Sequence, residues 1–589
     1  MSTNPMIAMN SQDEDTNPVN GLPPATDLPT ILASLGCCDS HSISHSNSNS
    51  AHTYRMPAEW EPHSACLILF PHNPDTFRVD KAAEEILGLA LAIATEGRES
   101  VVLLCRDAAH RERVAALVRE KRKALHAAES ENEIESESKI EHENEIEHEI
   151  EHEKTMPIRV AVCPSNDTWA RDTAPTFVVR TVTTTPTSTS KSTGKTDTND
   201  NNNDNAAAST STSTRELIGL DWDFNAYGGP EEGAYWPCTR DQAIARTICS
   251  ETTSVREVND CDCDCNNENQ NNNNDDNDSS LPGSLSIASS LHIPLILEGG
   301  SIHTDGEGTL LATAECLLHQ NRNPHLCRLD LEAILQRALG ISKILWLPYG
   351  LDHDDDTNGH VDNFCCFVRP GHVVLAWTDH KEEREEQEEE QEENDGNDEK
   401  RPVTNYERCR IALDYLQSQT DARGRSITVT KLHLPHPGLS YTHAEASSIG
   451  NANGKDSNGN DDEVDDEVDD HDDDDSNACT STNLTNSCTA LVRQPGEPMA
   501  ASYVNYYVAN GAVLVPQFGN DYEESDERAI ETLKALYCGG PTTNHRTVVG
   551  IPSREILLGG GNIHCQTQQV PAATNTNTNT NTSTGNTAR

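Results

Sequence analysis

Large apolar and aromatic residues are scarce in this chain of 589 residues, and basic residues are outnumbered. Only 34% of the residues are hydrophobic and 4% aromatic, while 97 Asp and Glu stand against 43 Lys and Arg. The length would allow roughly three or four domains, but the acid lies in runs such as 382–393 and 461–475 beside Asn, Ser and Thr tracts. Such segments cannot bury enough apolar surface to offset their ordering entropy. The composition therefore predicts one mid-sized folded domain interrupted by disordered insertions.

Other features are missing as well, and each absence excludes a class of protein. A formal net charge of −54 repels phosphates and favours cationic small molecules or basic proteins over nucleic acid. No apolar run approaches the length of a membrane span, and Met1–Asn20 has no basic-then-apolar signal. The clustered cysteines, among 19 in all, form no zinc-type C-x-x-C pair and fit a reducing compartment. We expect a cytoplasmic protein with no membrane contact and no metal site.

Composition also sets the expected boundaries of the folded part. Residues 1–51 predict a disordered tail with at most a short helical turn near 28–35, and 573–589 predict a disordered Asn/Thr-rich tail. A single domain is expected over 52–572. Low-complexity insertions interrupt it near 128–154, 183–214, 259–282, 380–400 and 450–494.

Hydrophobic periodicity inside this domain alternates between strand and helix, which is typical of an α/β fold. Strands are predicted at 65–70, 101–105, 158–163, 177–182, 217–224, 293–297, 309–313, 343–347, 364–368, 372–376, 426–434, 502–508, 513–516 and 548–551. Helices are predicted at 80–96, 108–121, 329–339, 406–418 and 526–537. The elements group into about five units of two strands, a helix and a strand. Carboxylates or histidines recur where strands end, which is where α/β folds place ligands.

The glycine run Gly559–Gly561 is followed by Cys565. Glycines let the backbone approach a ligand closely, and a cysteine with a partner histidine elsewhere is a candidate nucleophile. The alternative from these residues alone is a tight turn followed by a small buried thiol.

Candidate partners for a nucleophile lie upstream. His360 and Asp362 are two residues apart, so in extended chain they point to the same face and can line one pocket. Asp172 follows Trp169, and Glu298 precedes two glycines. The alternatives are a polar loop, a surface ion pair over a packed Trp, and a turn cap. A thiol, a base and several carboxylates together suit a guanidinium, which is planar, cationic and rich in donors.

At this point the sequence resembles the agmatine deiminase family, within the bacterial-type peptidylarginine deiminase superfamily. The resemblance rests on seven motifs in the family's order: MPAEWEPH (56–63), NDTWARDTAPTF (166–177), FNAYGG (224–229), LEGGSIHTDGEGT (297–309), DDDTNGHVDN (354–363), ASYVNYYVANGAVLVPQFG (501–519) and GGGNIHCQTQQVP (559–571). The chain differs from the family's usual residues at Phe70, Phe77 and Asp356.

The resemblance implies a five-bladed α/β propeller of ββαβ units that hydrolyses agmatine to N-carbamoylputrescine and ammonia for putrescine biosynthesis. It implies no metal or organic cofactor, and it allows a homo-oligomer. It makes Cys565 the nucleophile and His360 the general acid and base. The remaining roles it implies are guanidinium binding by Asp172 and Asp362, support of His360 by Glu298, and further substrate contacts by Trp169 and Asn505.

Three alternatives stay open on the sequence. An arginine or peptidyl-arginine deiminase shares the same chemistry and differs only in the tail pocket. An amidinotransferase shares the nucleophile but transfers the amidino group to an amine. A non-catalytic acidic protein would instead bind basic partners through its insertions.

Overall fold

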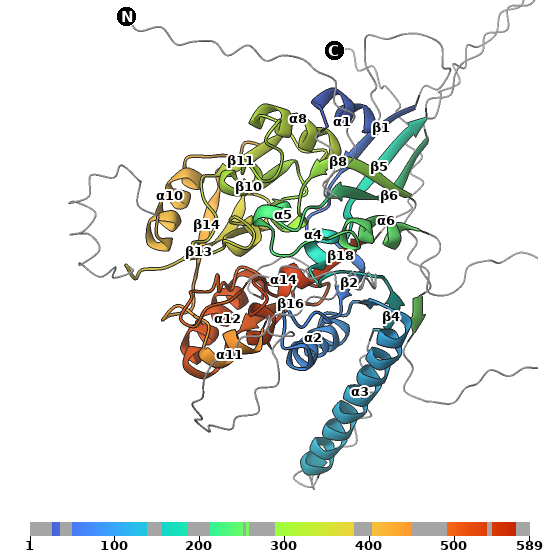
Figure 1. The fold of residues 1–589 in the computed structure, drawn as a ribbon, viewed down its shortest axis with the longest axis vertical. Coiled ribbons are helices and arrows are strands. Elements are labelled where there is room, and N and C mark those ends of the chain that lie inside the picture. Colours follow the sequence, from blue (N-terminus) through green and yellow to red (C-terminus); the bar gives the residue numbers. More distant parts are fainter. Residues whose placement is uncertain are drawn as a thin grey trace, which may run out of the picture.

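The computed structural model describes residues 26–35, 50–137, 156–184, 212–250, 255–257, 289–381, 403–449, 492–538 and 545–572. Most of each predicted insertion, and the predicted tail 573–589, lie outside these residues. The described part is a mixed α/β fold (Figure 1). Among the described helices, none is long and apolar enough to cross a membrane.

Within the described residues the strands form five sheets that share one arrangement. In each, two antiparallel strands are followed, after at least one helix, by a strand parallel to the second. The five sets are β5 (Thr176–Thr184), β6 (Thr212–Asp223) and β8 (Ser289–Ile296); β9 (Ile302–Thr304), β10 (Thr309–Thr313) and β11 (Lys343–Leu347); β12 (Cys365–Arg369), β13 (His372–Trp377) and β14 (Thr428–His433); β15 (Tyr507–Val508), β16 (Ala512–Gln517) and β17 (Thr547–Pro552); and β18 (Thr567–Pro571), β2 (His63–Leu69) and β3 (Val101–Cys105).

Edge strands and crossing helices complete these sheets. Three strands extend two of them: β1 (Ser50–Arg55) beside β5, and β4 (Ile158–Val162) and β7 (Val255–Glu257) beyond β3. The longest helix between each pair of parallel strands is, in the same order, α6 (Ile244–Cys249), α8 (Arg328–Leu339), α10 (Asn405–Gln417), α12 (Glu523–Tyr537) and α2 (Val79–Ala94). Parallel strands need such a crossover, and helices on the sheet faces bury the strands. All five residues of β3 are buried accordingly.

The sheet of β2 joins the two ends of the domain. The last strand, β18, pairs antiparallel with the early strand β2, with Gln568 opposite Leu67. Figure 1 shows this pairing as a red strand beside a blue one. Because α14 (Ile563–Gln566) runs directly into β18, the pairing carries the C-terminal glycine–cysteine segment next to the residues that precede β2.

The predicted strands 101–105, 309–313 and 343–347 match β3, β10 and β11, and the predicted hairpin across Asn510-Gly511 is β15–β16. The structure differs from the prediction in several places. Helix α3 (Ala108–Glu137) continues past 121 into the expected insertion, because its Glu, Lys and Ala residues are strong helix formers; Figure 1 shows it projecting from the domain. The strand predicted at 502–508 is only Tyr507–Val508.

The third difference lies in the expected N-terminal tail. Residues 28–34 form α1 (Leu28–Ser34), which Asp27 caps by accepting from the Thr30 N–H at 3.0 Å. Ile31 and Leu35 are buried in the core that α8 and β8 share. A few apolar residues in a polar segment were thus enough to dock a helix that composition alone assigns to a tail.

Candidate active site

Cys565 lies in α14, a single helical turn that the sequence did not predict. The Asn562 side chain begins this turn by accepting from the Ile563 N–H at 2.9 Å. Cys565 is only 3% exposed. Asn505 Nδ2 lies 3.1 Å from its Sγ, and the thiol points to Asp362 Oδ2 at 3.4 Å. The predicted nucleophile and two predicted partners therefore meet directly.

The glycine run before this turn is required by close packing. A Cβ at Gly561 would lie 2.6 Å from the Trp169 ring and 3.0 Å from Cys565 Cβ. Gly560 has φ +101, and a Cβ there would overlap the Asp356 carboxylate. The run therefore lets Trp169 and Asp356, from two distant segments, pack against the backbone that precedes Cys565, which fits the expected close approach of backbone to the site.

Gly300, in the turn η2 (Gly299–Ser301), marks the point where the predicted acids and base converge. A Cβ at this position would lie 2.6 Å from His360 Nδ1 and 2.9 Å from both Asp172 Oδ1 and Asp362 Oδ2. The extended chain predicted for two of them is not observed. His360 and Asp362 do not share a strand face; His360 precedes the 3-10 turn η3 (Val361–Asn363) that contains Asp362. The turn, and not an extended chain, aims both at the site.

Asp172 is fixed by two donors. Its Oδ1 accepts from the Gly300 N–H at 2.8 Å and its Oδ2 from the Tyr227 hydroxyl at 2.9 Å. Burial raises the pKa of Asp172, as does the nearby Asp362, although His360 acts in the opposite direction. Tyr227 was not singled out from the sequence, although it stands in the FNAYGG motif.

His360 is loosely held by comparison. It is fully buried, and neither ring nitrogen has a hydrogen-bond partner among the described residues. Its Nδ1 lies 3.9 Å from Asp172 and its Nε2 3.9 Å from Glu298. Burial opposes protonation, but Asp172, Cys316 and Glu298 together hold the pKa of His360 well above its ordinary value. Glu298 itself is ionised through Arg322, whose Nε lies 2.7 Å from Oε1 and which overcomes the effect of burial on the pKa of Glu298.

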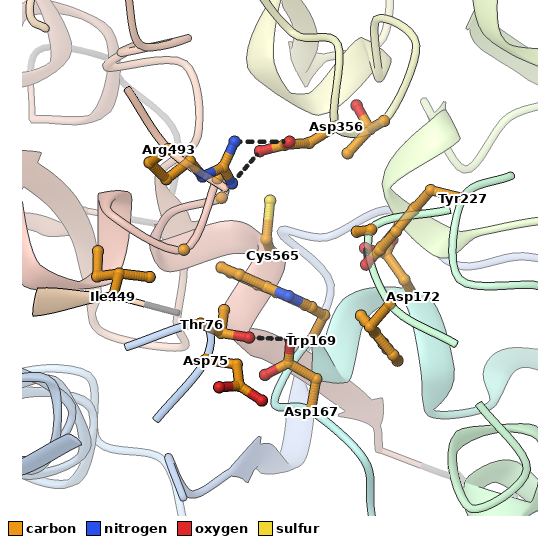
Figure 2. Close-up of a pocket in the computed structure, with 16 residues that line it drawn as sticks. Asp75, Thr76, Asp167, Trp169, Asp172, Tyr227, Asp356, Ile449, Arg493 and Cys565 are labelled. Carbon is orange, nitrogen blue, oxygen red and sulfur yellow. Dashed lines mark hydrogen bonds and ion pairs between the residues drawn. The ribbon is translucent and has the colours of Figure 1, made fainter. Parts of the chain in front are cut away.

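A cavity opens beside the thiol (Figure 2). Of the predicted residues, Cys565, Asp172 and Trp169 line it, whereas His360, Asp362, Glu298 and Asn505 are buried and do not line it. Three further acids line the cavity: Asp75, Asp167 and Asp356.

Two of these acids differ in how they are bound. Asp356 is held by Arg493 in two hydrogen bonds of 2.9 and 2.7 Å, which Figure 2 shows across the cavity from Trp169. Asp167 accepts from the Thr76 hydroxyl at 2.9 Å, while its Oδ1 is buried without a partner among the described residues. Arg493 lies inside the insertion that composition predicted at 450–494. The end of this segment, expected to be disordered, therefore contributes a residue to the cavity.

The electrostatics of the free site suit a cationic ligand. Burial and the carboxylates of Asp362 and Asp172 hold the pKa of Cys565 well above its ordinary value. A cation bound between these carboxylates would offset their charge and favour the thiolate. The arrangement can therefore bind a guanidinium and place its carbon near a thiol.

Comparison with known proteins places the chain in a family. The model of the Porphyromonas-type peptidyl-arginine deiminase family matches residues 55–571. The chain belongs to this family. An agmatine deiminase of Medicago truncatula is 34% identical over 89% of the chain and 98% of the relative. An agmatine deiminase of Ectopseudomonas mendocina is 32% identical over 88% of the chain and 96% of the relative.

The family likeness extends to the fold. A solved agmatine deiminase of Enterococcus faecalis is 25% identical, with a TM-score of 0.55, and the match covers 88% of this chain and 96% of that one. The family resemblance read from the seven motifs is thereby confirmed, and with it the mixed α/β fold.

Proposed function

We propose that the protein is an agmatine deiminase that hydrolyses agmatine to N-carbamoylputrescine and ammonia. The observation that carries the proposal is the convergence of His360, Asp172 and Asp362 on Gly300, next to the Cys565 thiol. Two carboxylates and a thiol around one point match a planar cation with an electrophilic carbon. The agmatine deiminases that resemble this chain over 88% or more of its length support the same assignment.

The first half of the reaction removes ammonia. Asp172 and Asp362 hold the guanidinium in an attack geometry, and its positive charge lowers the pKa of the Cys565 thiol, which releases its proton to solvent. The thiolate attacks the guanidinium carbon, and the protonated His360 gives its proton to the departing nitrogen. Ammonia leaves, and a thiouronium remains on Cys565.

The second half releases the product. His360, now neutral, takes a proton from water, and the hydroxide adds to the thiouronium carbon. The carbon–sulfur bond breaks, and the Cys565 sulfur leaves as the thiolate. The proton of the added hydroxyl passes to that sulfur, which restores the thiol and leaves the neutral substituted urea, N-carbamoylputrescine. In this scheme Glu298 keeps the His360 ring oriented, and Asn505 donates to the sulfur at 3.1 Å, which stabilises a thiolate.

The charges of the cavity favour agmatine over arginine. Agmatine ends in an amine, whereas arginine also carries a carboxylate. The cavity lining contains Asp75, Asp167 and Asp356 in addition to Asp172, and its one described cation, Arg493, is already paired with Asp356. The lining is therefore complementary to a second positive charge, while Trp169 offers an apolar wall to the alkyl chain.

The proposal includes the finer architecture and the setting expected from sequence. We propose that the five sheets are blades of a closed propeller, supported by their shared strand order and by the pairing of β18 with β2, which joins the chain's ends in one blade. A cytoplasmic location fits a free thiol nucleophile, which needs a reducing environment.

Ammonia release from agmatine, L-arginine and a blocked arginine peptide tests the proposal. We expect turnover of agmatine alone. Turnover of the peptide would show that the substrate is peptidyl-arginine. Transfer of the amidino group to an added amine, without release of ammonia, would make the protein an amidinotransferase.

Replacement of the nucleophile gives the matched control. Cys565→Ala is expected to abolish turnover, because no other group of the site can form the thiouronium. Cys366→Ala, a second buried cysteine that donates to Tyr506 and not to the site, is expected to keep it. Wild-type turnover by Cys565→Ser would overturn the assignment of the nucleophile.

A further inference from the structure

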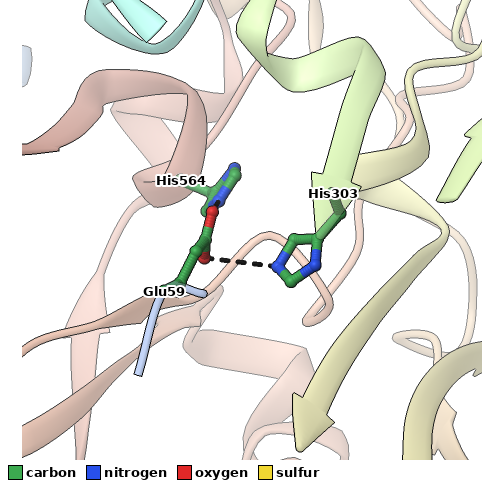
Figure 3. Close-up of side chains that lie close together, drawn as sticks. All are labelled: Glu59, His303 and His564. Carbon is green, nitrogen blue, oxygen red and sulfur yellow. Dashed lines mark hydrogen bonds and ion pairs between the residues drawn. The ribbon is translucent and has the colours of Figure 1, made fainter. Parts of the chain in front are cut away.

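Glu59, His303 and His564 form a buried cluster that the chemistry above does not use (Figure 3). Glu59 precedes β2, His303 lies on β9, and His564 lies on α14 beside the nucleophile. Each stands in one of the seven sequence motifs. All three side chains are buried, and buried charged groups need partners.

Both ring nitrogens of His564 face carboxylates. Nδ1 lies 2.9 Å from Asp362 Oδ2, and Nε2 lies 2.8 Å from Glu59 Oε1. An ionised carboxylate can only accept, so each nitrogen donates and the ring carries both protons. Burial and Arg171 oppose this charge, but Glu59 and Asp362 raise the pKa of His564 above its ordinary value. His564 is therefore a buried imidazolium.

Glu59 is held from its other side. Arg171 Nη1 lies 3.2 Å from Oε1, and His303 Nε2 lies 3.4 Å from Oε2. The Phe367 N–H donates to His303 Nδ1 at 3.3 Å, so the neutral His303 ring carries its proton on Nε2, toward Glu59. From Asp362 through the imidazolium and Glu59 to Arg171 the charges alternate and sum to zero, which offsets the cost of burying them.

The same three side chains could be mistaken for a metal site, because their ligand atoms lie within 4.8 Å of one another. The Arg171 guanidinium already occupies the cation's place beside Glu59, and it is anchored there by Gln569 Oε1 at 2.7 Å. A metal ion would have to displace it. The cluster is better suited to holding charge than to holding a metal.

We propose, on the basis of the deiminase function above, that His564 is a positioning residue that keeps Asp362 ionised and leaves one of its oxygens free for the guanidinium. His564 and Cys565 both face Oδ2, at 2.9 and 3.4 Å, whereas Oδ1 is buried without a partner among the described residues. Glu59 and His303 support the imidazolium from behind. Without it, Asp362 would share a buried site with Asp172, and two neighbouring carboxylates favour protonation of one.

The charged and titratable groups around Asp362 come from several elements. Cations hold its pKa below the ordinary value in spite of burial. The groups that face it are His564 and Cys565 from α14, His360 before η3, Asp172 and Arg171 from α4 (Ala170–Thr173), and Cys366 from β12. His564 is the cation that bonds to it directly, so its removal is expected to move the pH at which Asp362 takes up a proton.

The test compares His564→Asn with Glu59→Gln and with Glu99→Gln. Asn keeps an amide donor near the position of Nδ1 but carries no charge. Glu99 is the matched control, since it forms a second buried His–Glu pair, with His63 at 3.1 Å, and its other partners are Tyr507 and Asn510, outside the site. The measurement is kcat/KM for agmatine from pH 5 to 9, which reports on ionisations of the free enzyme.

His564→Asn is expected to lower kcat/KM at neutral pH about 10- to 100-fold, because the amide keeps a donor but loses the charge and the bond to Glu59. It is also expected to shift the acid limb of the profile upward by about one to three pH units. Glu59→Gln should shift the acid limb in the same direction by a smaller amount. Glu99→Gln should lower the melting temperature without shifting the acid limb. An unmoved limb in both site variants, or an equal shift in Glu99→Gln, would overturn the proposal.

A second measurement needs no turnover and separates this proposal from the proposed function. Methylguanidine should protect Cys565 from alkylation by iodoacetamide, and this protection should persist to a lower pH in the wild type than in Glu59→Gln or His303→Gln. These two variants keep the test possible if His564→Asn does not fold. Identical protection curves would refute the role of His564. If the protection curves shift but the protein does not turn over agmatine, the role of His564 stands and only agmatine as the substrate is refuted.

Discussion

Two histidines flank the nucleophile, and they are held in opposite ways. Neither ring nitrogen of His360 has a hydrogen-bond partner among the described residues, and its nearest carboxylates lie 3.9 Å away. His564 is bonded at both nitrogens, at 2.9 and 2.8 Å. A ring with open nitrogens can give and take protons, whereas a ring bonded at both cannot do so without breaking a bond. The contrast assigns proton transfer to His360 and charge compensation to His564.

The largest expected effect comes from removing the open histidine. His360→Asn should reduce kcat about 100- to 10,000-fold, the range for a lost general acid and base, and thus by more than His564→Asn. Steady-state kinetics at saturating agmatine would measure it.

The assignment of proton transfer to His360 and charge compensation to His564 would be contradicted if His360→Asn kept a normal pH profile at a reduced rate while His564→Asn abolished turnover. The roles of the two rings would then be exchanged. Normal methylguanidine protection of Cys565 in His360→Asn would show that the binding site remains folded.

An intermediate effect is expected from crowding the open side of the site. Gly300→Ala places a Cβ 2.6 Å from His360 Nδ1 and 2.9 Å from each guanidinium-binding carboxylate. A displacement of about 1 Å in the reacting groups costs about 100-fold in rate, so kcat/KM should fall by about that much.

Gly88→Ala is the matched control. Gly88 lies in α2, and a Cβ there meets nothing within 4 Å. Alanine in a helix interior is favoured over glycine by about 0.5–1 kcal/mol. This variant should therefore keep full activity with a slightly higher melting temperature, and a loss of activity in it would remove the steric explanation for Gly300→Ala.

The length and regularity of an element decided whether the sequence could predict it. Apolar runs such as 309–313 and 343–347 predicted their strands at the observed bounds, because burial on both faces leaves a continuous hydrophobic signal. Two- to four-residue elements such as β15 and α14 carry no periodicity, so the turn that bears Cys565 was missed. The short helical turn allowed near 28–35 is present as α1, but its docking in the core was not predicted, because its contacts come from elements distant in the sequence.

Within the site, residue types predicted the reacting groups but not their supports. A cysteine, a histidine and carboxylates near strand ends indicated the chemistry, and the structure brings Cys565, His360, Asp172 and Asp362 together. His564 escaped notice, since a histidine next to a nucleophile has no periodic or spacing signal. Its role depends on Glu59, which lies 505 positions away in the sequence.

The smallest expected effect concerns two acids of the cavity that, like the two histidines, differ in how many of their polar atoms are hydrogen-bonded. Arg493 holds both oxygens of Asp356, whereas Asp167 keeps one oxygen free. Burial, with a contribution from Asp241, raises the pKa of Asp167 to about 8. Asp167 is therefore mostly protonated at pH 6, where Asn is a close mimic, and ionised at pH 9, where an alkylamine with a pKa of about 10 is still charged.

The ratio of KM for agmatine between Asp167→Asn and wild type should accordingly rise from near one at pH 6 to several-fold at pH 9. Stability should move the opposite way. A raised folded-state pKa stabilises the protein fully below about pH 4 and loses that contribution as pH rises through about 8, so Asp167→Asn should gain stability relative to wild type as pH increases. Asp356→Asn, which leaves Arg493 unpaired, should show no such trend in KM over this range. A flat ratio for Asp167→Asn, together with a rising one for Asp356→Asn, would mean that the amine displaces Arg493 and binds the held acid instead of the free one.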